Sequence, residues 1–282
     1  MNLTAPQDIR ALLDRHGFHF SRSMGQNFLI DSAVPPAIAD AAGPDQGCAV
    51  LEIGPGIGPL TEQLALRAGQ VVAVELDGSL LPVLAETMAA HGNVEIVHGD
   101  VMKLDLAALA AEKFGGRPAM VCANLPYNIT TPVLTKLLES RLFRSITVMI
   151  QREAAQRVCA APGQEGYGVF SLLCQYYANC TPLFDVPPCC FLPPPKVTST
   201  VIRLDVWDAP PVAAPAGPLL RLVRAAFAQR RKTLLNALGS VYGTLSKDAL
   251  RQALADCRLS ETVRGEQLSL QQFSDLTVRL CG

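Results

Sequence analysis

Five short apolar segments, separated by stretches of helical periodicity, constrain the fold of this 282-residue chain more than any other feature. Each has the length of a β-strand, and they lie at 49–53, 70–75, 93–98, 118–123 and 145–150. Strands that alternate with helices lie parallel in one doubly wound sheet. Two later strand segments, 180–186 and 199–206, have no convincing helix between them. We therefore expect a hairpin that makes the last strand of a mostly parallel α/β sheet antiparallel.

A glycine-rich turn follows the first of these strands. Gly54, Gly56 and Gly58 stand between the strand and a helical stretch over 60–68. Glycines permit a tight turn there and let the backbone approach a ligand closely. The G-x-G-x-G spacing differs from the G-x-G-x-x-G of dinucleotide sites, so the turn alone is only weak evidence for a nucleotide ligand.

Polar residues end the next three strands. Glu75 closes the second strand, about 20 residues after the glycines, where a carboxylate that binds a ribose belongs. Asp100 follows the third strand and Asn124 follows the fourth. Because ligands bind at the carboxyl ends of strands in open α/β sheets, we expect these residues to line one crevice with Gly54.

The corner Asn124-Leu125-Pro126-Tyr127 has the groups needed to hold the amino group of a planar base. Pro126 lacks an N–H and favours an extended Leu125, whose carbonyl can then point out of the sheet. The Asn124 side-chain oxygen could accept the second amino proton, and the Tyr127 ring could stack on the base. The alternative is a structural turn with a half-buried tyrosine.

Seven motifs together resemble the KsgA type of S-adenosylmethionine-dependent rRNA adenine N6-dimethyltransferases. They span most of the chain, and none has an incompatible replacement. In order, they are Gly25-Gln26-Asn27-Phe28-Leu29, Leu51-Glu52-Ile53-Gly54-Pro55-Gly56-Ile57-Gly58, Val74-Glu75-Leu76-Asp77, Gly99-Asp100, Asn124-Leu125-Pro126-Tyr127-Asn128-Ile129, Pro193-Pro194-Pro195-Lys196-Val197 and Phe227-Ala228-Gln229-Arg230-Arg231-Lys232-Thr233-Leu234. The resemblance implies a Rossmann-like methyltransferase sheet with a small C-terminal helical domain.

The resemblance also implies how the cofactor is bound. Asn27 and Leu29 would close over S-adenosylmethionine, and Gly54 would lie against its methionine part. Glu75 would take the ribose hydroxyls, and Asp100 would bind the amino group of the cofactor adenine. S-adenosylhomocysteine is the implied product, and no metal is expected.

For the target base, the resemblance implies catalytic roles at the same corner. Asn124 would face the transferred methyl as well as the adenine amino group, with Leu125 and Pro126 completing the grip. Phe191 would be the second stacking face, opposite Tyr127. The implied substrate is a pair of adjacent adenines near the 3′ end of 16S rRNA, in the 30S subunit or its precursor, methylated during ribosome maturation.

Composition and cysteine usage agree with a reduced, cytoplasmic globular enzyme. Hydrophobic residues make up 49% of the chain and charged residues 17%, which excludes a disordered chain. The nine cysteines form no C-x-x-C pair, and the adjacent Cys189 and Cys190 suit a disulfide poorly. His16 and His19 could share a helix face, but the four histidines form no convincing metal set. Residues 1–10 lack the pattern of a signal peptide.

The predicted domain organisation follows from the resemblance and, for the linker, from composition. The resemblance implies a methyltransferase domain over 1–208, with segment 1–48 covering the cofactor. The stretch 209–218 is rich in proline and alanine and is typical of a linker. A helical RNA-recognition domain follows at 219–282. We expect a monomer without a membrane segment.

The charge of the chain is divided unevenly. Residues 216–282 carry ten Lys or Arg against five Asp or Glu, a net charge of +5, whereas 1–215 carry 14 against 20, a net charge of −6. A helix over 219–238 would place four basic side chains within about a quarter-turn. These are Arg221, Arg224, Arg231 and Lys232. A solvated basic face is the ordinary interpretation, but beside a base-binding corner we expect phosphate contacts, with Lys196 as a further candidate.

Three other functions remain open from the sequence. A 23S rRNA methyltransferase of the antibiotic-resistance type shares nearly all of these motifs. A DNA adenine methyltransferase shares the Asn-x-Pro-Tyr corner but usually has a larger recognition domain than the 67 residues after 215. A non-catalytic nucleic-acid-binding relative would be expected to have lost the glycine turn or the corner, and both are intact here.

Overall fold

The structure is a computed structural model that describes residues 1–18, 26–241 and 246–281. Contacts divide the chain into two compact units: 1–155 with 180–206, and 156–179 with 207–282. The sequence-based boundary near residue 208 therefore differs from the structure at 156–179, which pack with the C-terminal helices.

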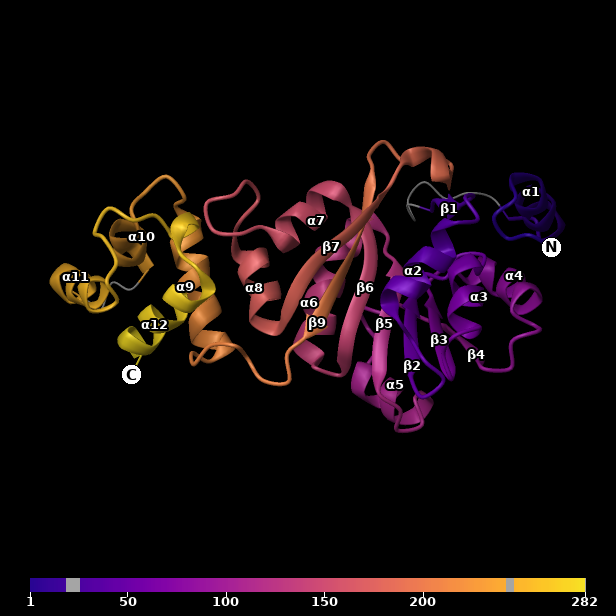
Figure 1. Ribbon diagram of the computed structural model, residues 1–282, viewed down its shortest axis with the longest axis horizontal. Helices are drawn as coiled ribbons and strands as arrows, with labels where there is room; N and C mark the ends of the chain where they lie inside the picture. Colours follow the sequence, from indigo (N-terminus) through magenta and orange to yellow (C-terminus); the bar gives the residue numbers. More distant parts are fainter. Residues whose placement is uncertain (19–25, 242–245, 282) are drawn as a thin grey trace. The chain divides into compact units, whose positions relative to one another are not determined.

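The first unit contains a seven-stranded sheet with the order β4-β3-β2-β5-β6-β9-β7 (Figure 1). Its strands are β2 (Ala49–Ile53), β3 (Gln70–Glu75), β4 (Val94–His98), β5 (Ala119–Asn124), β6 (Phe143–Gln151), β7 (Ala178–Val186) and β9 (Ser199–Val206). Pairings from β4 to β6 are parallel, and β9 runs antiparallel to β6. The predicted α/β sheet with an antiparallel last strand is confirmed; that strand is inserted between β6 and β7 rather than at the edge.

Helices connect the strands much as the periodicity predicts. They are α1 (Pro6–Arg15), α2 (Val34–Ala42), α3 (Pro59–Ala65), α4 (Leu81–Thr87), α5 (Leu106–Lys113) and α6 (Thr130–Ser140). A separate two-stranded sheet pairs β1 (Phe28–Leu29) with β8 (Phe191–Leu192). No helix in the described ranges is both long and apolar enough to cross a membrane.

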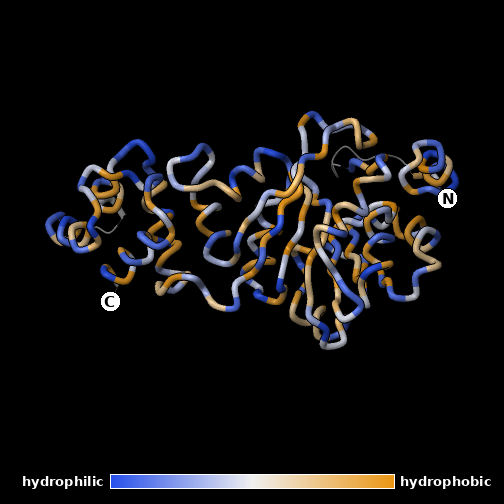
Figure 2. Tube along the Cα trace, in the orientation of Figure 1, coloured by the Kyte–Doolittle hydropathy of each residue, from blue (hydrophilic) through white to orange (hydrophobic). Residues whose placement is uncertain are grey.

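The core of the first unit lies between the sheet and its covering helices. All five residues of β2 are buried, because the strand has a neighbour on each side and helices over it. On one face, Ile38 of α2 and Leu64 of α3 pack in one apolar cluster with Val50 and Met120 of the strands. Figure 2 shows hydrophobic residues along these central strands. Burial at about 25 cal/mol per Å² of apolar surface is what holds the strand ends in register.

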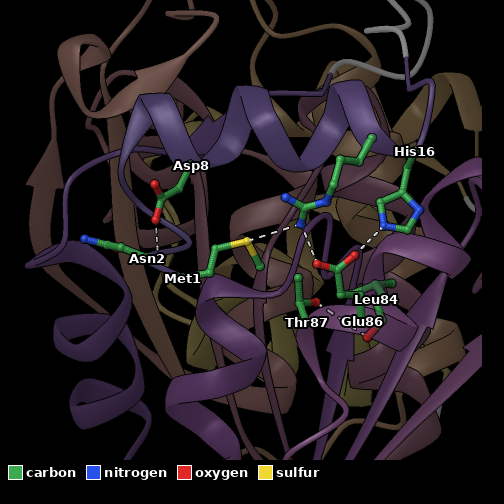
Figure 3. A network of polar contacts seen from close by, with 8 residues as sticks. Met1, Asn2, Asp8, His16, Leu84, Glu86 and Thr87 are labelled. Carbon is green, nitrogen blue, oxygen red and sulfur yellow. Dashed lines mark hydrogen bonds and ion pairs between the residues drawn. The ribbon is translucent and has the colours of Figure 1, made fainter.

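The N-terminal helix α1 and the residues next to it make polar contacts with α4 (Figure 3). Glu86 accepts a hydrogen bond from Arg15, and its second oxygen lies 2.7 Å from His16 Nε2. Met1 and Asn2 lie beside α1, and the Asn2 backbone N–H donates to the Asp8 carboxylate on that helix. His16 therefore has a hydrogen-bond partner in the fold, and His19 lies outside the described residues.

The second unit is helical. It contains α8 (Val169–Tyr177), α9 (Ala216–Ala228), α10 (Leu234–Val241), α11 (Lys247–Asp256) and α12 (Leu270–Cys281), and α7 (Arg152–Cys159) leads into it. Tyr167 is fully buried there, packs edge-on against Phe227 with ring centroids 6.1 Å apart, and donates to the Leu268 carbonyl at 2.7 Å. These contacts explain why 156–179 belong to this unit.

The predicted linker is part of the same packing. Ala214 is buried, its N–H donates to Ser274, and its carbonyl accepts from the Tyr176 hydroxyl. Helix α9 begins at Ala216, inside the predicted linker 209–218. The proline-rich stretch before α9 therefore consists largely of bends, and Ala214 fastens it to the helices of this unit.

The expected single helix over 219–238 is wrong. Helix α9 ends at Ala228, and Gln229 leaves helical geometry with φ −131° and ψ 61°. A new helix begins at Leu234. Its N–H donates to the Val263 carbonyl, whereas in a continuous helix it would donate to the carbonyl four residues earlier. A tertiary hydrogen bond thus replaces the helical one, and the basic residues at 231 and 232 lie in the turn between two helices.

Candidate active site

One cavity opens at the carboxyl ends of β2, β3 and β5 and beyond β4. All six residues predicted to bind the cofactor line it, together with three further residues of the Asn-x-Pro-Tyr corner. They are Asn27, Leu29, Gly54, Glu75, Asp100 and Asn124, with Leu125, Pro126 and Tyr127. The parallel register brings them together, since it places Ile53 beside Val74 and Glu75 beside His98.

Two glycines of the turn line the cavity with backbone that carries no side chain. Gly54 has φ +68° and Gly56 has φ +63°, a region that side-chain-bearing residues rarely adopt. A Cβ on Gly56 would also lie 3.2 Å from the ring of Phe28 in β1. The turn therefore allows the short N-terminal strand to come down onto it and close one side of the cavity.

Glu75 is held by backbone donors from both sides. Its Oε2 accepts from the Gly56 N–H at 3.2 Å, and its Oε1 accepts from the Asp77 N–H at 2.8 Å. Only 6% of the residue is exposed, and burial raises the pKa of Glu75 although these hydrogen bonds oppose the rise. Asp77 in turn accepts from the Gln26 side chain at 2.7 Å, which ties the segment before β1 to the rim of the cavity.

The Asp100 loop is fixed by its own backbone and by a lysine. The Met102 N–H donates to Asp100 Oδ1 at 2.9 Å, which orients the carboxylate. The Lys136 ammonium on α6 donates to the carbonyls of Met102 and Leu104 at 2.9 and 2.6 Å. Lys136 therefore joins this loop to the helix that follows the Asn-x-Pro-Tyr corner.

The corner itself presents unused hydrogen-bonding capacity. Asn124 ends β5 and is half-buried, and its side-chain amide makes no hydrogen bond within the described part of the chain. The Leu125 N–H donates to the Met149 carbonyl at 3.1 Å, whereas its own carbonyl accepts no hydrogen bond from any described residue. Pro126 has φ −57° and ψ 132°, and Tyr127 begins a short 3-10 turn.

Phe191, expected to stack on the base opposite Tyr127, is a buried side chain in this structure. It does not line the cavity, and only 2% of it is exposed. Its strand β8 pairs with β1, and its side chain packs in the apolar cluster that also contains Leu29 and Val201. Burial in that cluster supports the cavity wall instead of offering a stacking face.

The remaining predicted residues lie elsewhere. Lys196 is exposed in the loop before β9 and does not line the cavity. Arg221 and Arg224 are exposed on α9, and Arg231 and Lys232 are exposed in the turn after it, all within the second unit. Gly25, from the first motif, lies outside the described residues.

Glu52 is a cavity residue to which the sequence prediction gave no role. It sits inside the fully buried strand β2, lines the cavity, and is 1% exposed. Burial raises the pKa of Glu52 to about 8, and the charge of nearby Glu75 adds to the rise. Its Oε2 has no hydrogen-bond partner among the described residues. A single acid within the apolar run Leu51–Ile53 was the signal that could have identified it.

The fold and the cavity together define a Rossmann-like methyltransferase: a glycine turn, acids at the next two strand ends, an Asn-Leu-Pro-Tyr corner and an antiparallel last strand. Comparison with known families specifies the class further. Residues 17–279 match the family described as ribosomal RNA adenine dimethylase. The chain belongs to that family, and it is an rRNA adenine methyltransferase.

Similar proteins agree over nearly the whole chain. The chain is 46% identical over 280 residues to ribosomal RNA small subunit methyltransferase A of Alkaliphilus oremlandii, covering 99% of this chain and 98% of the relative. Among solved structures, the 23S rRNA methyltransferase ErmE is 25% identical with a TM-score of 0.71, covering 91% of this chain and all of that one. A dimethyladenosine transferase from Plasmodium falciparum, 24% identical, shares the fold with a TM-score of 0.75 over 88% of this chain and 95% of its own.

Replacing Glu52 with glutamine should change how stability depends on pH. The folded-state pKa of about 8 lies above the ordinary 4.5, so the native protein keeps this carboxyl protonated while the unfolded chain ionises it. Wild-type stability is therefore greatest relative to Glu52→Gln below pH 4.5, and it falls as pH rises toward about 8. Urea unfolding of both proteins across this range measures the difference. A difference that is constant with pH would mean that the fold does not raise the pKa of Glu52.

Proposed function

We propose that the protein uses S-adenosylmethionine to dimethylate N6 of two adjacent adenines in a hairpin loop near the 3′ end of 16S rRNA. The substrate would be the 30S subunit or its precursor, and the reaction would belong to ribosome maturation in the cytoplasm. The observation that carries the proposal is the Asn124 amide, which lines the cavity without a hydrogen bond to the described protein. An unsatisfied, half-buried amide at a strand end is suited to bind a ligand.

The residues that line the cavity suit S-adenosylmethionine. Gly54 leaves space for the methionine part, because a Cβ there would meet only Pro126, at 3.9 Å. Glu75 would accept the ribose hydroxyls, and Asp100 would bind the adenine amino group. Asn27 and Leu29 would cover the bound cofactor. When bound, the cofactor supplies an electrophilic methyl group on a sulfonium.

The corner would activate the target amino group. The N6 lone pair of adenine is delocalised into the ring and is a poor nucleophile. Acceptance of its two protons by the Asn124 side-chain oxygen and the Leu125 carbonyl would favour tetrahedral nitrogen. The same acceptors would stabilise the positive charge that develops on the nitrogen during attack. Holding the reacting atoms in line adds the proximity contribution.

Tyr127 would support the base by stacking rather than by proton transfer. Its hydroxyl is hydrogen-bonded to Ser199 at 2.8 Å, and burial raises the pKa of the phenol. No general base is required before attack, since the methylated ammonium loses its proton readily. A flipped-out adenine would gain about 1–3 kcal/mol from stacking on the ring, which offsets part of the cost of leaving its own stack.

We choose small-subunit rRNA as the substrate because the chain is more similar in sequence to small-subunit methyltransferases than to a 23S enzyme. Relatives named as ribosomal RNA small subunit methyltransferase A are 43–46% identical to this chain, whereas the 23S enzyme ErmE is 25% identical. Mapping of tritiated methyl groups onto undermethylated 30S particles, 50S particles and DNA tests the choice directly. We expect label on adjacent adenines of the 30S particle alone. Label on the 50S particle would favour the 23S alternative.

The second unit would supply RNA recognition. Residues 216–282 are basic, with a net charge of +5, and four of the basic side chains are exposed on α9 and in the turn after it. Because α9 ends at Ala228, these four residues do not lie on one face of a single helix. All four are exposed, so they remain accessible to phosphate. Lys196 would be a separate contact from the first unit.

Glu75→Ala should weaken S-adenosylmethionine binding by at least about a hundredfold. Each lost hydrogen bond from a ribose hydroxyl to a charged acceptor is worth about 1.5–3 kcal/mol. Isothermal titration calorimetry measures the affinity, and Glu75→Gln, which keeps the shape and one acceptor oxygen, should lose less. Unchanged affinity in Glu75→Ala would show that the ribose is bound elsewhere.

Asn124→Ala should separate chemistry from binding. We expect methyl transfer under saturating S-adenosylmethionine to fall by about a hundredfold or more, because acceptors aimed at developing charge contribute on that scale. Affinity for the RNA particle should stay nearly unchanged, since phosphate contacts dominate it. Asn179→Ala, an exposed asparagine outside the cavity, is the matched control. A near wild-type rate in Asn124→Ala would make the corner merely structural.

Neutralising Arg221, Arg224, Arg231 and Lys232 should weaken 30S binding and flatten its salt dependence. Loss of four phosphate contacts lowers the slope of log K against log salt by roughly 3. Filter binding across a salt series measures that slope, and calorimetry should show unchanged S-adenosylmethionine affinity. Neutralising the exposed Arg10 and Arg117 serves as the control. An unchanged slope in the quadruple variant would place the RNA surface elsewhere, with Lys196 the next candidate.

A further inference from the structure

Tyr127 is anchored from behind by a residue that does not reach the cavity. Its hydroxyl lies 2.8 Å from the hydroxyl of Ser199, the first residue of β9. Ser199 is completely buried and is absent from the cavity lining, so its only route to the site is through the tyrosine. The motif Pro193–Val197, to which the proposed function gives no part except for Lys196, ends two residues before it.

The sheet fixes the position of this serine. Ser199 pairs with Gln151 at the carboxyl end of β6, and the ladder continues through Thr200 and Ile150. Because β9 is antiparallel, it begins at the edge of the sheet where the parallel strands end. The antiparallel direction of β9 therefore places the buried Ser199 hydroxyl next to the Tyr127 hydroxyl.

We propose that Ser199 is a positioning residue that sets the orientation of the Tyr127 ring against the target base. A tyrosine side chain can swing about its Cα–Cβ bond, and stacking requires the ring to lie at one place against the base. The backbone of Tyr127 is already held, since its carbonyl accepts from Thr130 Oγ1 at 3.3 Å. The hydroxyl bond to Ser199 fixes the far end of the ring and with it the direction of the ring axis. This inference rests on the proposed function, in which the ring stacks on adenine.

Loss of either hydroxyl should leave cofactor binding intact and slow the transfer step. In Ser199→Ala, the half-buried phenol loses its partner and the ring turns to find another, because a buried polar group without a hydrogen bond is costly. We expect the single-turnover rate at saturating cofactor and RNA to fall about tenfold. The affinity for S-adenosylmethionine should not change.

A double-mutant cycle distinguishes positioning from general packing. Tyr127→Phe keeps the ring and removes the same hydrogen bond from the other side. If Ser199 acts through that bond, Ser199→Ala should slow the Tyr127→Phe enzyme no further. The matched control is Thr200→Val, which removes the neighbouring buried hydroxyl; that hydroxyl bonds Asp185 at 2.6 Å, away from the corner. This control should transfer methyl at the wild-type rate.

The experiment measures methyl transfer to the RNA particle that the wild type labels, with calorimetry of S-adenosylmethionine on every variant. Wild-type rates in Ser199→Ala or in Tyr127→Phe would overturn the inference, as would losses that multiply in the double variant. Should Ser199→Ala fail to fold, the Tyr127→Phe rate alone decides. A wild type that labels no RNA while binding cofactor would count against the proposed function, whereas wild-type activity with unaffected variants would count only against Ser199.

Discussion

The burial of β2 between β3 and β5 is the constraint on which the rest of the site depends. Parallel strands that share one core end at the same edge, so the hydrogen-bonding register that pairs Ile53 with Val74 also brings the glycine turn beside Glu75. The apolar cluster around Val50 fixes that register, because a slip of one residue would move every side chain of the strand to the opposite face of the sheet and out of its packed neighbours. The register therefore brings polar groups from separate segments together, and the hydrogen bond from the Gly56 N–H to Glu75 follows from it.

Buried acids show the cost of this arrangement. Glu52 and Glu75 lie in or at the end of strands with almost no exposure, and burial raises the pKa of both. Glu75 is compensated by two backbone N–H groups, whereas Glu52 retains an oxygen without a partner in the described chain. Such groups are destabilising in an isolated fold, and a bound ligand that provides donors would relieve them.

The two short strands and the last long strand have supporting roles. Pairing of β1 with β8 closes the cavity above Gly56, where a side chain would collide with Phe28. The same pairing buries Phe191, which was expected to face the base, in the apolar cluster with Leu29. Strand β9 approaches from the opposite direction and places Ser199 behind Tyr127. Contacts between distant segments thus decide how the corner is held.

The sequence alone determined the strands, the sheet type and the cavity residues, because strand periodicity is local and parallel strand ends must coincide. Three strands, including 49–53, match to the residue, and Gly54, Glu75, Asp100 and Asn124 do line one cavity. Only the tertiary structure decided that the helix breaks after Ala228, where the Leu234 N–H donates to the Val263 carbonyl instead of continuing the helix. The tertiary structure also decided that 156–179 pack with the helical unit. It also decided the burial of Phe191. Each of these depends on a partner far away along the chain, which local periodicity cannot reveal.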